Sequence, residues 1–515
     1  TGFALGVALR LALYAAGAYE YLEEHLELNT PVTSHVRLKE CLFLLESGIS
    51  PYLGNTCHHP PLVLQLFLPL HRAASGLAHF GVLIAIDVAT ALLLQALAAQ
   101  YAAARSRAGK HYEDAQVRLP KLTGPGGEEV DPDGPPPAAT APRSGELLTP
   151  AFVGLLYLLN PLTVASCAAL SLQGLHHLFA ALALVLAGAG CGGASATSLA
   201  ILLYVCPLTP IVLVVPCAFL AYCQRQDIRG SAGSDSSVYL TAYKRSKEDS
   251  LLDVRFLLYL VGFALAVAVL LGCLCGASLA VMSGEPHFLQ ACFASVLLVR
   301  DLTPNVGIFW YIFVEVFDRF RSLFLLAFQG HLFFYSVPLH LRLGRHRPVG
   351  PFLHGILAIG IISLFRPYPT LSDHALMLSA LMIPGELLHE TERNFVFLMG
   401  GQLFGLCMFP TMVTVWLGRN AGNANFLYNM TLVINIFGTL LMQAWAGAGM
   451  RLRRRQRVGL FCRDIVLAAV EDMLASSRAP AAVGEGKAAS ASELKPAPAA
   501  ASGVCGDGGK LRRRR

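Results

Sequence analysis

The 515-residue chain is 55% hydrophobic and only 14% charged, and its mean hydropathy is +0.55. This composition excludes an ordinary soluble enzyme and indicates an all-α, polytopic membrane protein. The net charge of +6 does not indicate nucleic-acid binding, because the Lys and Arg residues collect in a few connecting segments instead of forming one basic face.

The first apolar run extends from Gly2 to Tyr19 and contains one cation, Arg10. Small residues near its end also fit a cleaved signal peptide, but we favour a retained helix. Residues 20–60 are predicted to form a lumenal loop that contains an amphipathic helix. Further apolar runs of roughly 17 to 25 residues predict about twelve transmembrane helices in a domain covering residues 1–475.

Basic segments set the predicted orientation. Lys and Arg cluster at residues 105–118, 225–255, 342–347 and 451–457. Because positively charged loops remain cytosolic, we predict cytosolic loops at residues 105–147 and 224–255, and the even number of helices places both termini in the cytosol. Residues 124–143 and the tail 476–515 are rich in small residues and Pro, and are predicted to be disordered. The cytosolic tail either contacts anionic lipid or stays solvated.

The thirteen Cys residues are scattered, mostly within apolar runs, and no C-x-x-C pair has the spacing of metal ligands. We therefore expect neither a zinc site nor a disulfide framework. No metal or other cofactor is expected.

The most informative segment is the sequence DLTPNVGIFWY at residues 301–311, between two long apolar runs. Thr303 and Pro304 suit the cap and first position of a helix, and Trp310 with Tyr311 suits an aromatic belt at the membrane interface. The same carboxylate, amide and aromatic groups also suit a ligand site. The residues alone leave both interpretations open.

Two motifs resemble polytopic glycosyltransferases that use dolichol-phosphate-linked sugars, such as the first mannosyltransferase of glycosylphosphatidylinositol (GPI) synthesis. They are SPY at residues 50–52 and NPL at residues 160–162. Those enzymes carry an acidic pair in the first loop, where carboxylates can bind a metal or accept a proton. In this chain the aligned positions are Val32, Thr33 and Ser34, so the main residues for such a transfer are missing.

The chain shows a stronger resemblance to the PIG-U family of GPI transamidase subunits. The motifs that carry it follow in family order: SGISPY (47–52), YLLNPLT (157–163), PLT (207–209), DLTPNVGIFWY (301–311), YPT (368–370) and ANF (424–426). The resemblance implies a glycosyltransferase-C-like fold in the endoplasmic reticulum membrane, without catalytic residues. It implies a PIG-K-like catalytic subunit, PIG-T, PIG-S and the anchor attachment subunit as partners.

The resemblance further implies that the chain binds or presents the GPI lipid, or the C-terminal attachment signal of the protein substrate. A dolichol-phosphate-dependent glycosyltransferase of the GPI pathway is the alternative. The predicted orientation places four polar or aromatic segments on the non-cytosolic face. These segments are 50–52, 301–311, 366–370 and 420–425. With His58 of the first loop, they supply ten candidate ligand-binding residues: Tyr52, His58, Asp301, Asn305, Trp310, Tyr311, Arg366, Tyr368, Asn423 and Asn425.

The chemistry of these side chains is complementary to a GPI anchor. Amides and Arg suit glycan hydroxyls and phosphate oxygens, and aromatic rings suit the acyl boundary. Structural alternatives remain for three of them. Asn425 also suits a helix cap, Arg366 a side chain that snorkels to the interface, and His58 a contact between the loop and a helix.

Overall fold

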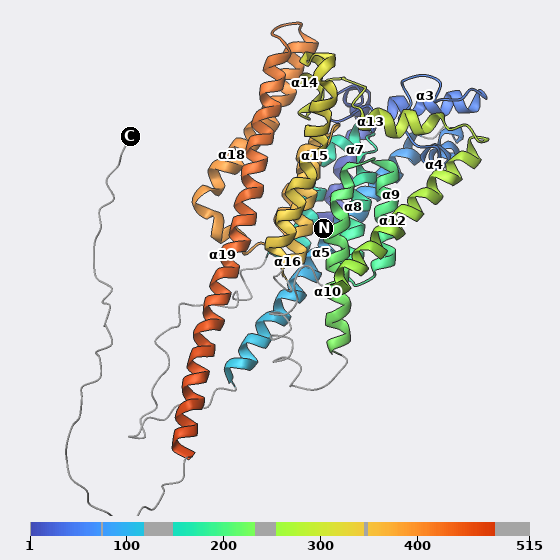
Figure 1. Cartoon of the computed structure of the whole chain (residues 1–515). Coiled ribbons are helices and arrows are strands. Elements are labelled where there is room, and N and C mark those ends of the chain that lie inside the picture. The colour runs from blue at the N-terminus through green and yellow to red at the C-terminus, as the bar shows by residue number, and fades with distance from the viewer. Residues whose placement is uncertain (1, 74–75, 118–147, 232–253, 345–348, 479–515) are drawn as a thin grey trace, which may run out of the picture. The chain divides into compact units, whose positions relative to one another are not determined.

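The computed structural model describes residues 2–73, 76–117, 148–231, 254–344 and 349–478. All regular secondary structure in these ranges is helical, without a β-strand (Figure 1). The chain forms two compact units, residues 1–459 and 460–515, and the ten candidate residues belong to the first. The predicted disordered segment 124–143 lies outside the described residues, as does the tail from residue 479.

The first half of the chain contains α1 (Gly2–Ala15), α2 (Ala18–Leu22), α3 (His35–Glu46), α4 (Pro61–Arg72), α5 (Gly76–Val117), α6 (Pro150–Leu158), α7 (Pro161–Ala168), α8 (Gln173–Gly188), α9 (Gly192–Val205), η1 (Thr209–Leu213) and α10 (Val214–Ser231). The second half contains α12 (Val254–Val281), η2 (Leu289–Ala294), α13 (Ser295–Leu297), α14 (Phe309–Glu315), α15 (Asp318–Leu343), α16 (Val349–Phe365), α17 (Leu371–Leu381), α18 (Leu387–Val413), η3 (Thr414–Gly418) and α19 (Ala424–Arg478).

Five of the described helical segments are long and apolar enough to cross a membrane, and they lie in α5, α12, α15, α18 with η3, and α19. The bent pair α6 and α7, with an angle of 46°, adds a sixth if the two form one span. Shorter apolar helices of 10–17 residues are α1, α8, α9 and α16. The chain is therefore an all-helical, membrane-spanning protein, as its composition predicts.

Two of the sequence motifs prove to be helix starts. Asn160 accepts a hydrogen bond from the Leu162 N–H at 3.0 Å, and Pro161 opens α7. At the start of α17, Thr370 and Asp373 form a reciprocal capping box. A polar cap followed by Pro, or a capping box, satisfies N–H groups that have no partner inside the helix. These motifs therefore set where the chain changes direction.

The N-terminal helix α1 is part of the core. Arg10 is fully buried and donates to Asp87 Oδ2 on α5 from Nε at 3.0 Å and from Nη2 at 2.8 Å. Its Nη1 donates to the Leu158 carbonyl at 2.8 Å. A charge inside a membrane protein needs such partners. This ion pair joins α1 to α5.

The predicted lumenal loop contains a disulfide that the sequence analysis did not foresee. Cys41 on α3 is bonded to Cys57, 16 residues later, with their Cα atoms 5.8 Å apart. The bond ties α3 to the segment that leads into α4, and these two helices lie side by side (Figure 1). The expectation of no disulfide framework was wrong for this pair because both Cys lie in the predicted non-cytosolic loop, where oxidation is favoured.

Candidate functional site

The 301–311 segment forms an irregular loop that leads into the short helix α14. Asp301 Oδ1 accepts hydrogen bonds from the Thr303 N–H at 2.9 Å and from its hydroxyl at 2.5 Å. In the same way, Asn305 Oδ1 accepts the Gly307 N–H at 2.7 Å. Side chains that bond to the backbone two residues on stabilise turns, so two consecutive turns shape this loop.

The predicted helix start at Thr303 was wrong. Helix α14 begins only at Phe309, and Ile308 occupies its N-cap position. The physical reason is competition for hydrogen bonds. The Gly307 N–H, which would donate to the Thr303 carbonyl in such a helix, donates to Asn305 Oδ1 instead, and that carbonyl accepts from Asn305 Nδ2 at 3.1 Å. Pro304 consequently lies in a loop.

Three segments meet at Asp301. Arg37 on α3 donates from Nη1 to Asp301 Oδ2 at 2.9 Å, and His58 Nε2 lies 3.9 Å from the same oxygen. The Tyr368 hydroxyl donates to the Asp301 carbonyl at 2.9 Å. The structure thus brings together Asp301, His58 and Tyr368, which the sequence analysis had assigned to one face. We call Arg37, His58, Asp301 and Tyr368 the Asp301 cluster.

Asp301 acts as an anion in this cluster. Burial raises the pKa of the Asp301 carboxyl, but hydrogen bonds from Thr303 and the charge of Arg37 outweigh burial and hold the pKa below its usual value. A carboxyl with a lowered pKa stabilises the folded state above its unfolded pKa of about 3.9, and the contribution disappears as the pH falls through the folded-state pKa. At neutral pH Asp301 accepts hydrogen bonds and donates none.

Tyr52 and His58 make internal contacts. The Tyr52 hydroxyl donates to the His59 carbonyl at 2.7 Å, and His58 Nδ1 lies 2.7 Å from the Ala291 carbonyl. Burial lowers the pKa of His58 and raises that of Tyr52, so both are neutral at physiological pH. The contact between loop and helix that was the structural alternative for His58 is therefore present.

Within the described ranges, no group of three or more His, Cys, Asp or Glu side chains could hold a metal ion.

We expect Asp301→Ala to loosen the loop more than Asp301→Asn. The amide of Asn can still accept the Thr303 N–H but carries no charge for Arg37, whereas Ala removes both interactions, each worth roughly 1 to 3 kcal/mol when a charged group is involved. Hydrogen–deuterium exchange of residues 299–311 should rise from wild type to Asp301→Asn to Asp301→Ala. Equal exchange in all three proteins would contradict this role.

Aromatic and amide side chains from α14, η3 and the start of α19 form a second cluster. The Tyr311 hydroxyl donates to Asn425 Oδ1, and the Tyr311 ring stacks on Tyr428 with centroids 4.6 Å apart. Trp310 stacks on Trp416 at 6.1 Å and packs edge-on against Tyr428 at 6.0 Å. Rings that pair in these geometries stabilise each other beyond the area they bury. We call these five residues the aromatic cluster.

The polar rim of the aromatic cluster is exposed. Asn423 and Asn425 are both accessible, and Asn423 Oδ1 accepts the Asn425 N–H at 3.1 Å. Because α19 begins at Ala424, the residue that caps this helix is Asn423, and the predicted cap at Asn425 was wrong. The amide of Asn425 is held by Tyr311 instead.

Arg366 is buried and bonds to residues outside the Asp301 cluster. Its side chain donates from Nη1 to Asp373 Oδ1 at 3.1 Å, and Nη2 lies 3.1 Å from His176 Nδ1. Asp373 Oδ1 also accepts from Gln173 at 2.7 Å. With Arg366 only 3% exposed, the snorkelling alternative was wrong, and an anionic ligand could bind this guanidinium only by displacing Asp373.

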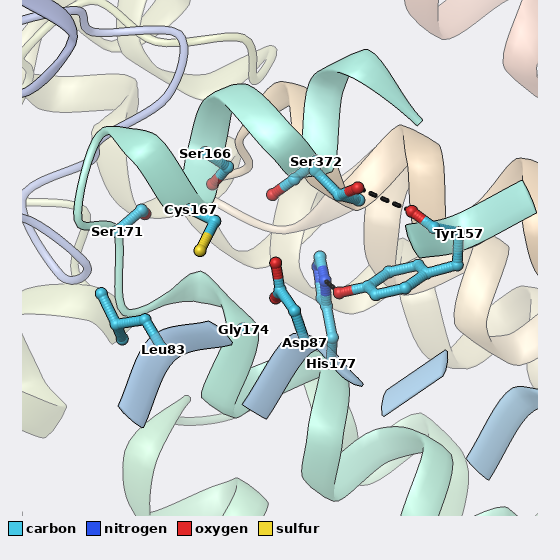
Figure 2. A pocket seen from close by; sticks show the side chains of 10 residues that line it. Leu83, Asp87, Tyr157, Ser166, Cys167, Ser171, Gly174, His177 and Ser372 are labelled. Atoms are coloured by element: carbon cyan, nitrogen blue, oxygen red, sulfur yellow. Dashed lines mark hydrogen bonds between the residues drawn. The ribbon is translucent and has the colours of Figure 1, made fainter. Parts of the chain in front are cut away.

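A small polar pocket lies beside this interior network (Figure 2). Asp87, Tyr157, His177 and Ser372 are among the residues that line it, and the Tyr157 hydroxyl lies 2.9 Å from His177 Nδ1. None of the ten candidate residues contributes to its walls. Its space is about that of one water molecule, so it cannot accept a lipid or a sugar.

Three residues of the two clusters were not predicted from the sequence: Arg37, Trp416 and Tyr428. Arg37 pairs with a residue 264 positions away, and no local pattern indicates such a partner. The available signal was a cation on the predicted loop helix, on the same membrane face as Asp301. Trp416 and Tyr428 flank the Asn-rich turn between two predicted spans, and aromatic residues near the ends of spans are typical of the membrane interface.

Comparison with known proteins gives matches that cover most of the chain. A family model described as GPI transamidase subunit PIG-U matches residues 4–434. The chain belongs to the PIG-U family. The GPI-anchor transamidase component PIGU of Homo sapiens is 30% identical over 458 residues, which cover 89% of this chain and 94% of the human protein. The GPI transamidase component GAB1 of Saccharomyces cerevisiae is 26% identical over 454 residues, 86% of this chain and 93% of the yeast protein.

The PIG-U match extends from α1 into α19. It therefore includes the Asp301 cluster, the aromatic cluster, the interior network and all ten candidate residues. The PIG-U motifs named from the sequence also lie inside the matched range. The matched range ends before the predicted tail 476–515.

Proposed function

We propose that this chain is a subunit of a GPI transamidase complex in the endoplasmic reticulum membrane, where it holds the GPI lipid or the C-terminal attachment signal for a catalytic subunit. The observation that carries the proposal is the PIG-U match over residues 4–434. Its relatives are named as GPI transamidase components. The proposed partners are a PIG-K-like catalytic subunit, PIG-T, PIG-S and the anchor attachment subunit.

The proposal includes a non-catalytic role and a glycosyltransferase-C-like arrangement of about twelve spans. The acidic pair of the glycosyltransferases is replaced by Val32, Thr33 and Ser34, which removes the groups that would bind a metal or accept a proton. Among the described residues, the five long apolar helices, the bent pair α6 and α7 and the four shorter apolar helices are the ones that we propose as spans, and the total of about twelve remains part of the proposal.

The two clusters are the proposed ligand site. The 301–311 segment joins them, since Asp301 belongs to the first and Tyr311 to the second. Exposed amides at Asn423 and Asn425 can donate to glycan hydroxyls or phosphate oxygens, and the adjacent rings suit the acyl boundary. Bound ligand would therefore lie along this segment rather than in the interior pocket.

Asn425→Lys is expected to lower GPI loading about tenfold, because losing one polar contact in a binding site costs roughly 1 to 3 kcal/mol. The substitution also removes the acceptor of the Tyr311 hydroxyl. Bound GPI, extracted from the purified complex and quantified by mass spectrometry against subunit amount, gives the measurement. The matched control is Asn429→Lys, which places the same cation at an exposed Asn one turn further along α19. Equal loading in the two variants would count against the site.

Two experiments test the function itself. Affinity purification in mild detergent should recover a cysteine-protease-like subunit with this chain, and a chain that purifies alone would overturn the subunit assignment. Incubation of the purified chain with dolichol-phosphate mannose and GPI precursors should give no sugar transfer. Transfer above the level of a mock preparation would establish the glycosyltransferase alternative.

A further inference from the structure

Arg321, in the first turn of α15, binds the ends of two other helices. Its Nη2 donates to the carbonyl of Val299 at 2.9 Å and to that of Leu298 at 3.3 Å. Its Nη1 donates to the Phe313 carbonyl at 3.4 Å, and the guanidinium lies 5.2 Å from the centroid of the Phe313 ring. Leu298 is the C-cap of α13, and Phe313 lies in the last turn of α14.

These contacts satisfy acceptors that helices leave open. The last carbonyls of a helix have no partner within it and carry the negative end of the helix dipole, so a cation there is favourable. α13 and α14 are the two helices on either side of the 301–311 loop. One guanidinium therefore connects the chain just before the loop with the helix just after it.

The end of α13 has an unusual residue for its conformation. The Arg300 N–H donates to the Ser295 carbonyl at 3.0 Å, as in a Schellman turn, and Val299 occupies the left-handed position with φ +47°. Gly is the usual residue at this position, and a β-branched side chain is strained there. Val299 is also buried, at 1% exposed, so contacts outside the turn must hold it.

We propose that Arg321 is a positioning residue for the ligand site. By holding the strained turn at Val299 and the end of α14 together, it sets the path of the loop that carries Asp301 and Asn305. It also sets the direction in which α14 presents Trp310 and Tyr311 to the aromatic cluster. The proposal rests on the proposed function for its ligand readout, but its structural readout is independent of it.

The test compares Arg321→Met with Arg319→Met, which removes an exposed Arg two residues earlier. In the assembled complex, Arg321→Met should raise hydrogen–deuterium exchange across residues 299–311 and lower GPI loading about tenfold, the scale expected when a binding loop loses its anchor. Arg319→Met should change neither. Equal exchange in the two variants would overturn the proposal.

A second-site variant separates positioning from general stability. Val299→Gly relieves the strain of the left-handed turn but also removes a buried side chain, so the rescue is measured against Val299→Gly alone: Arg321→Met should cause a smaller loss of loop protection and of loading in the Val299→Gly background than in wild type. Failure of this rescue would show that Arg321 acts in some other way. If Arg321→Met does not assemble, Arg321→Lys takes its place, because Lys keeps one donor for the Val299 carbonyl. Hydrogen–deuterium exchange of residues 299–311 in Arg321→Lys should lie between those of wild type and a fully exposed loop. Exchange in Arg321→Lys equal to that of wild type would overturn the proposal. A complex that carries no GPI in any variant refutes the lipid-binding part of the proposed function, while the exchange data still decide the role of Arg321.

Discussion

Arg366→Met is expected to lower the free energy of unfolding by about 3 to 5 kcal/mol, because it leaves a buried carboxylate without its cation. Asp373 is 2% exposed and accepts from Arg366 at 3.1 Å and from Gln173 at 2.7 Å. Its Oδ2 accepts the Thr370 N–H at 2.8 Å in the capping box of α17. Removing one partner of a buried ion pair lowers the free energy of unfolding by more than the intact pair adds to it, because the other charge is left buried and unpaired.

A double-mutant cycle gives this prediction its control. Arg366→Met/Asp373→Asn removes both charges and keeps an acceptor for the cap, so it should be less destabilising than Arg366→Met alone. Arg72→Met breaks the exposed pair with Glu46, in which Arg72 is 65% exposed, and should cost no more than about 1 kcal/mol. Denaturant unfolding of each purified chain in one detergent measures the series. If Arg366→Met lowers the free energy of unfolding by no more than Arg72→Met does, the buried pair does not stabilise the fold in this way.

The buried pair of Arg366 and Asp373 shows what the sequence could not reveal. Fold class follows from local composition, because apolar runs must bury every backbone polar group inside helices when they cross a bilayer. Charge asymmetry between loops likewise predicts which segments share a face, and the structure brings Asp301, His58 and Tyr368 into contact. Whether Arg366 reaches the interface or the interior depends on a partner in the next helix, and that is a property of packing.

Hydrogen-bond competition limited the prediction of local structure. At Thr303 the residues suited a helix start, but the Asn305 side chain bonds the Gly307 N–H and the Thr303 carbonyl that the helix would have joined. At Asn425 the residue type was right for a cap, and Asn423 filled that position two residues earlier. Both errors concern which of several neighbouring polar groups takes a given N–H, and propensity alone does not decide this.

Loss of the disulfide between Cys41 and Cys57 has the second large expected effect. A closed loop of this length restricts the unfolded chain by roughly 3 kcal/mol, so Cys41→Ser and Cys57→Ser should each destabilise the purified chain by about that amount. The double variant should lose no more than either single variant, because one bond is removed in all three. Cys407→Ser, which changes an exposed free Cys on α18, is the matched control and should have little effect.

The disulfide also bears on the Asp301 cluster and on membrane orientation. Arg37 lies one turn before Cys41 on α3, and His58 directly follows Cys57, so the bond joins the two segments that face Asp301. Its loss should therefore raise hydrogen–deuterium exchange at residues 299–311 as well as in the loop itself. Because stable disulfides form in oxidising compartments, thiol alkylation of denatured, unreduced protein from membranes should spare Cys41 and Cys57. Free thiols at both positions would place this loop in the cytosol and reverse the orientation on which the ligand site rests.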